Sequence, residues 1–158
     1  DWLPAVQARL MNYVQEGGNV IVQYNTNNGV GPLRSRIGPY PFAISRARVT
    51  MENTPVTLLQ PQHPAFNFPN KIGAADFEGW IQERSIYHAT DVDKAYTQLL
   101  GMADAGETSD NNSLITAQYG RGWFTYTGLV FFRQLPAAVP GAYRLLANLI
   151  ALNQKKEM

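Results

Sequence analysis

The residues that support acid–base and metal chemistry in proteins are scarce in this 158-residue sequence. It contains two histidines, His63 and His88, and no cysteine. A cysteine nucleophile, a disulfide and a thiolate metal ligand are therefore excluded. The histidines form no His-x-x-His or His-Glu-x-x-His pattern, which is the spacing of histidine-based zinc sites. We expect no metal site and no cofactor, and we expect His63, which precedes Pro64, to hydrogen-bond a turn backbone.

Paired carboxylates offer a second route to catalysis. Asp76, Glu78 and Glu83 are close enough in the sequence to supply such a pair, but the turn predicted between them fixes no separation. Glu83 next to Arg84 is more typical of a structural ion pair. The sequence therefore leaves Glu83, together with His63, only as a weak candidate for catalysis.

Nucleophiles and ligands in α/β folds gather where a strand ends in a turn. In this chain such a junction reads Gln23-Tyr24-Asn25-Thr26-Asn27. It holds neither serine nor cysteine, and Thr26 has no base beside it. The asparagines either bond their own turn or contribute to ligand binding, and both interpretations stay open at this stage.

Charge is nearly balanced overall but unevenly distributed. The net charge is +1, without the basic footprint of nucleic-acid-binding proteins. Residues 17–51 include four arginines and no acid, whereas residues 76–110 include eight acids. Either the two segments neutralise each other across the fold, or the arginine loop binds anions. No apolar run approaches the ~20 residues that span a bilayer, so we expect no membrane span.

The hydrophobic pattern predicts an α/β fold. Helical spacing predicts a helix over 3–16, ended by a glycine pair, and a buried strand over 19–24 follows at once. A glycine- and proline-rich loop covers 25–41, and a single strand is expected within 96–103. Further elements are short strands at 42–45, 48–52 and 55–59, a helical turn at 74–78, a β-hairpin formed by 114–119 and 123–127, and a last helix at 140–153. Alternation along 123–127 predicts that only one face of that strand is buried.

Several strings carry a resemblance that covers nearly the whole chain. The order of the first helix, Gly17-Gly18-Asn19-Val20-Ile21-Val22-Gln23-Tyr24-Asn25, His63-Pro64, the stretch Asp76 to Arg84, Tyr119-Gly120-Arg121-Gly122 and a terminal helix resembles the class I glutamine amidotransferase-like fold in its ThuA-like branch. The strings Pro39-Tyr40-Pro41-Phe42, Pro69-Asn70-Lys71-Ile72 and Phe131-Phe132-Arg133-Gln134-Leu135-Pro136 are similar to the C-terminal domain of large bacterial PIG-L/LmbE-like deacetylases. The resemblance implies a flavodoxin-like sheet flanked by helices. Residues 1–158 would then form a single domain with an added β-hairpin. This domain would be incomplete and would be the C-terminal part of a longer chain.

The catalytic motifs of these families do not transfer to this chain. Where amidotransferases place their cysteine, this sequence has Tyr24 and Asn25, and the partner histidine is replaced by Tyr126-Thr127-Gly128. The zinc motif of the deacetylases is also missing, because Gln62-His63-Pro64-Ala65 lacks its two aspartates. The resemblance therefore implies a non-catalytic domain whose partner is an N-terminal catalytic domain or a missing N-terminal segment.

Three functions follow as expectations. The first is a non-catalytic, amidotransferase-like domain of a carbohydrate deacetylase-like protein that binds substrate glycan or supports assembly, in a periplasmic or secreted parent. The second is a ThuA-like sugar hydrolase or isomerase that uses His63 and Glu83 as its acid/base pair, and the third is a structural protein-interaction module. The candidate ligand surface lies at the carboxyl end of strand 19–24 and consists of Asn25, Asn27, Arg34, Arg36, Glu83, Arg84, Tyr126 and Arg133.

Overall fold

The computed structural model describes residues 3–34 and 36–154. The helices are α1 (Leu3–Gln15), α2 (Phe131–Gln134) and α3 (Pro140–Ile150), with 3-10 helices η1 (Pro64–Phe66), η2 (Ala74–Phe77) and η3 (Ala151–Asn153). The longer strands are β1 (Asn19–Gln23), β9 (Leu114–Tyr119) and β10 (Gly122–Thr127). The two-residue strands are β2 (Ala43–Ile44), β3 (Arg48–Val49), β4 (Thr57–Leu58), β5 (Ser85–Ile86), β6 (Ala89–Thr90), β7 (Thr97–Gln98) and β8 (Leu100–Gly101). The molecule is therefore a mixed α/β structure, as the sequence predicted.

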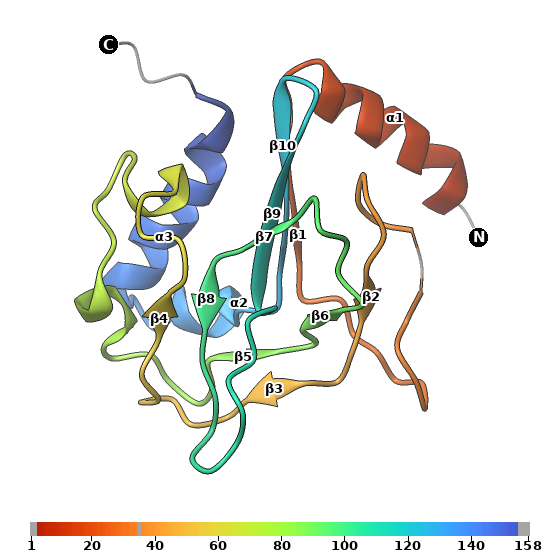
Figure 1. Ribbon diagram of the computed structural model, residues 1–158. Helices are drawn as coiled ribbons and strands as arrows, with labels where there is room; N and C mark the ends of the chain where they lie inside the picture. The colour runs from red at the N-terminus through yellow and green to blue at the C-terminus, as the bar shows by residue number, and fades with distance from the viewer. Residues whose placement is uncertain (1–2, 35, 155–158) are drawn as a thin grey trace.

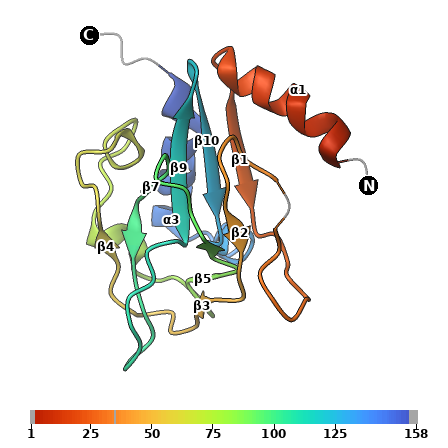
Figure 2. The same ribbon diagram turned by 45° about the vertical axis from the view of Figure 1, so that its right-hand side comes forward.

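A four-stranded sheet in the order β1-β10-β9-β7 forms the centre of the molecule (Figures 1 and 2). β1 runs parallel to β10, and β9 is antiparallel to both of its neighbours. The predicted hairpin is confirmed, with a tight turn at Gly120 and Arg121 between β9 and β10. Gly120 has a φ of 59°, and a Cβ there would lie 2.5 Å from the carbonyl oxygen of Gln15. This turn therefore fits under the end of α1 only with glycine.

Both faces of the sheet are covered. On one face, Ile21 and Trp123 pack with α3, η1 and η2, and on the other, Phe124 and Tyr126 pack with Met11 and Val14 of α1. The prediction that only one face of 123–127 is buried is wrong, because Thr125 and Thr127 are as buried as the rings between them. Their hydroxyls have partners in neighbouring segments, which removes the cost of burying them.

Three two-stranded ladders, β2–β6, β3–β5 and β4–β8, lie beside the central sheet (Figure 1). The strand expected within 96–103 is interrupted at Leu99, where the chain changes partners. Before it, β7 pairs with β9, and after it, β8 pairs with β4. Leu99 itself donates to the carbonyl of Leu114 and accepts from the amide of Leu59, so it links the two sheets.

Strand β1 lies at the edge of the central sheet (Figure 2). The amide of Tyr24 donates to Thr127, and the carbonyl of Gly18 accepts from Trp123. Because backbone groups alternate along a strand, Asn19, Ile21 and Gln23 turn theirs away from the sheet. Among the described residues, no helix is both long and apolar enough to cross a membrane.

Candidate functional site

The residue directly after β1 occupies the corner where the sequence placed the ligand surface. Tyr24 has a φ of 48°, a left-handed conformation that is unfavourable for a side chain of this size. Its ring packs edge-on against Tyr87 at 5.2 Å and Phe132 at 4.6 Å between ring centroids. An aromatic cluster therefore fills this corner, which we call the β1 corner.

Two predicted site residues meet beside the β1 corner. The Nε of Arg133 lies 3.1 Å from Oε1 of Glu83, and its guanidinium stands 5.1 Å over the ring of Phe132. Burial raises the pKa of Tyr24, and the negative charge of Glu83 raises it further. The phenol therefore stays protonated at neutral pH and offers no anionic nucleophile.

Tyr126 and Asn25 also reach this end of the sheet, but they serve the fold. Tyr126 is fully buried, and its hydroxyl donates to the carbonyl of Tyr87 at 2.6 Å. Burial raises the pKa of Tyr126. Tyr126, predicted at the ligand surface, has no exposed surface in this structure. Asn25 is half-buried, and its amide donates to the carbonyl of Gln23 at 3.5 Å.

The loop residues expected at the same surface are used elsewhere. Asn27 is buried, and its amide donates to Gly31 and Ile44 at 2.9 and 2.8 Å. Arg34 pairs with Asp91 at 2.6 Å in an exposed ion pair. Arg36 is exposed, and its positive charge partly offsets the burial that raises the pKa of Tyr96. The structure therefore shows Asn27 as an anchor of the loop and places Arg34 beside the residue that follows β6.

The proposed acid/base pair of His63 and Glu83 is not assembled. His63 caps η1, where its Nδ1 accepts from the amide of Ala65 at 3.1 Å, and its ring meets Trp123 at 5.5 Å. The predicted bond to a turn backbone is confirmed, and burial lowers the pKa of this imidazole. Trp123 is the second residue of β10, while Arg133, which pairs with Glu83, lies beyond the last residue of that strand. At a rise of about 3.3 Å per residue, the strand alone separates the two groups by about 13 Å.

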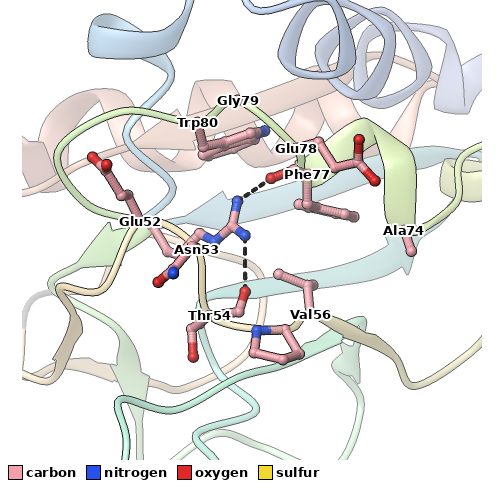
Figure 3. A pocket seen from close by; sticks show the side chains of 11 residues that line it. Glu52, Asn53, Thr54, Val56, Ala74, Phe77, Glu78, Gly79 and Trp80 are labelled. Atoms are coloured by element: carbon pink, nitrogen blue, oxygen red, sulfur yellow. Dashed lines mark hydrogen bonds between the residues drawn. The ribbon is translucent and has the colours of Figure 1, made fainter.

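Arg84 lines a pocket of about 450 Å³, which Figure 3 shows from close by. Only 4% of Arg84 is exposed. Its guanidinium donates to the carbonyls of Phe77 and Thr54 and stacks on Trp80, 5.8 Å from the ring centroid. Its Nε has no partner. Burial lowers the pKa of Arg84, and the negative charge of Glu52 only partly offsets this effect. The loss of hydration of the guanidinium is therefore not fully compensated by a carboxylate.

A third group was missed by the sequence reasoning. The hydroxyl of Ser85 lies 2.7 Å from Nε2 of His88, and Nδ1 of His88 lies 3.0 Å from Oδ1 of Asp110. The signal was a serine three residues before one of the two histidines in the chain. The order of atoms is that of a catalytic triad.

Burial argues against catalysis by this triad. Ser85 and His88 are fully buried, and the side chain of Asp110 is 29% exposed. The hydroxyl, which must meet the substrate, is thus among the deepest groups and is further covered by the sulfur of Met102 at 3.7 Å. The three side chains therefore link β5 and the turn before β6 to the segment that follows β8.

Comparison with known proteins adds a likeness of fold. No family model matches the sequence, and no curated protein matches it. Among solved structures, the "Cytoplasmic Protein STM3548 from Salmonella typhimurium" is similar, with a TM-score of 0.51 and 16% sequence identity. The match covers 93% of this chain but only 59% of that protein. This likeness supports the mixed α/β fold and carries no information on activity.

Proposed function

We propose that the chain is a non-catalytic, amidotransferase-like domain of a larger PIG-L/LmbE-type carbohydrate deacetylase-like protein. The observation that carries this proposal is the β1 corner. Tyr24 stands where the resembled fold places its nucleophile, and its neutral ring is packed between Tyr87 and Phe132. The raised pKa of this phenol leaves it without the anionic form that a nucleophile needs, which supports a role of the domain in binding or assembly.

The open edge of β1 supports a place within a larger protein. Strands with outward-facing backbone groups are normally shielded by charge, proline or a neighbour. Residues 19–23 contain neither charge nor proline, and Val20, Ile21 and Val22 are only half-buried. We propose that polypeptide N-terminal to this chain, belonging to the catalytic domain or to a segment before it, pairs with this edge.

The glycan-binding part of the proposal rests on the rim of the β1 corner. Phe132 is 49% exposed, the guanidinium of Arg133 stands over its ring, and the side-chain amide of Gln82 bonds to that guanidinium. An exposed ring edged by an amide and a guanidinium is a surface that suits a sugar.

Titration calorimetry with oligosaccharides and sugar acids tests the glycan surface. We expect millimolar affinity that the double variant Phe132→Ala/Arg133→Ala abolishes. The matched control is Arg34→Ala, which removes an exposed arginine paired with Asp91 on the loop. Absence of heat for every glycan, from a chain shown to be folded by circular dichroism, overturns the glycan-binding role.

One observation favours the interaction module as a second candidate. Arg34 and Arg133 are both engaged with protein carboxylates, as expected when arginines serve the fold. The same calorimetry separates the candidates: if glycans fail to bind, titration of the recombinant N-terminal catalytic domain tests the module directly. That titration should then give heat, and Phe132→Ala should reduce it.

A further inference from the structure

The pocket lined by Arg84 is a second candidate site, distinct from the β1 corner. It lies between the segment 52–56, η2 and the turn at Gly79 and Trp80 (Figure 3). Its volume of about 450 Å³ falls within the range of small-molecule sites. Val56, Ala74 and Phe77 supply an apolar side, and the polar side chain of Asn53 also lines the pocket.

Arg84 is the feature of this pocket that needs a partner. A guanidinium has five N–H donors and is always charged. Two of its nitrogens meet neutral carbonyls, and Nε meets nothing. The ion pairs found among the described residues do not include Arg84. An anion at this wall would supply the missing countercharge in a setting where burial strengthens the attraction.

The carboxylates at the pocket limit which anion fits. Glu52 and Glu78 line it too, but both are exposed, and Glu52 accepts the backbone amide of Gln82 at 2.5 Å. Neither forms an ion pair with Arg84 among the described residues, although the charge of Glu52 partly offsets the lowering of the Arg84 pKa, and both repel a ligand that carries several negative charges. The carboxylate oxygens can accept hydrogen bonds from the hydroxyl groups of a ligand. The side-chain amide of Asn53 can both accept and donate such bonds.

We propose that this pocket binds a small hydroxylated monocarboxylate of the sugar-acid class, with its carboxylate directed at Arg84. The inference does not depend on the glycan surface proposed for the β1 corner, because the two sites share no residue. A charge-assisted hydrogen bond to a buried guanidinium contributes more than one between neutral groups, so the carboxylate provides most of the discrimination.

The test uses D-glucuronate as the probe and glucose as its neutral counterpart. Each sugar is titrated into the folded chain up to about 10 mM, and the amide and indole NMR chemical shifts are measured. We expect saturable shifts at Phe77, Gly79 and the indole of Trp80 with glucuronate, and at least about tenfold weaker binding of glucose.

Two exposed alanines of η2 provide matched variants that leave the bonds of Arg84 intact. Ala74 lines the pocket and Ala75 does not, so Ala74→Trp should abolish glucuronate binding while Ala75→Trp retains it. Equal binding of glucose, persistence of binding in Ala74→Trp, or no saturable shift at these positions would overturn the inference. Shifts confined to Tyr24 and Arg133 would overturn it while supporting the glycan surface of the β1 corner.

Discussion

The buried Ser85, His88 and Asp110 show why the order of atoms does not by itself define an active site. The 2.7 Å contact of Ser85 with His88 is a hydrogen bond as in a serine hydrolase, whereas the 3.0 Å contact of His88 Nδ1 with Asp110 is not directed as one. A working nucleophile must reach its substrate, and an oxyanion needs free backbone donors beside it. The amide of Ile86, next to Ser85, is already bonded to the carbonyl of Gly128.

Ser85 should therefore be unreactive towards a fluorophosphonate probe. Incubation of the folded chain followed by peptide mass analysis should find no adduct on Ser85, because neither its hydroxyl nor His88 is accessible to solvent. A serine hydrolase labelled in the same tube confirms that the reagent is active. Modification of Ser85 that His88→Gln abolishes would show that the segment opens and that the triad is catalytic.

Acid should weaken the link between Asp110 and His88. Burial raises the pKa of Asp110, but the proximity of His88 and the hydrogen bond from the amide of Asn112 outweigh that effect and leave the pKa lowered. Because the folded state holds the carboxylate more strongly than the unfolded chain does, this stability is present above pH ~4 and is lost as pH falls through the lowered pKa. Urea unfolding from pH 6 down to 3 should show a smaller loss of free energy in Asp110→Asn than in the wild type.

The longer elements were predictable because their signals are local. The first helix, predicted over 3–16, spans Leu3–Gln15, and the hairpin turns at Gly120 as its sequence indicated. Tertiary pairing decided the rest. The break at Leu99 depends on which strands flank it, and the burial of Thr125 depends on the helices on the other face. Neither partner is visible in the local pattern.

Asn148 illustrates how one polar residue joins two elements. From the buried face of α3, its Oδ1 accepts from the amide of Asn70, and its Nδ2 donates to the carbonyls of Ala65 and Asn70. Asn148→Ala should lower the free energy of unfolding by about 3 kcal/mol, since it leaves several buried groups without partners. Urea denaturation measures this, and Asn12→Ala on the exposed face of α1 should change the value by less than about 0.5 kcal/mol. A loss of similar size in both variants would refute this role.

At the scale of the whole molecule, the sequence located the region of the candidate site but not its composition. Glu83 and Arg133 do meet at the end of β10, as a convergence of polar residues on one edge predicted. Asn27 and Arg34 are missing from it because a glycine- and proline-rich loop has no periodicity that places its side chains. In the sequence, Tyr24 marks only the position of a missing catalytic cysteine, whereas in the structure its ring is the centre of the β1 corner.

At the same scale, β1 lies at an end of the central sheet, and we expect the isolated chain to self-associate through this edge. Gln23 is exposed and turns its backbone outward, so a lysine there places a charge beside an approaching strand and disfavours pairing. Gln23→Lys should reduce concentration-dependent self-association, measured by light scattering after size exclusion, without altering the free energy of unfolding. Asn12→Lys adds the same charge on α1 and should leave the association unchanged. Equal effects of the two substitutions would mean that net charge, rather than the edge of β1, controls association. The difference between the two variants therefore measures how much the edge of β1 contributes to self-association.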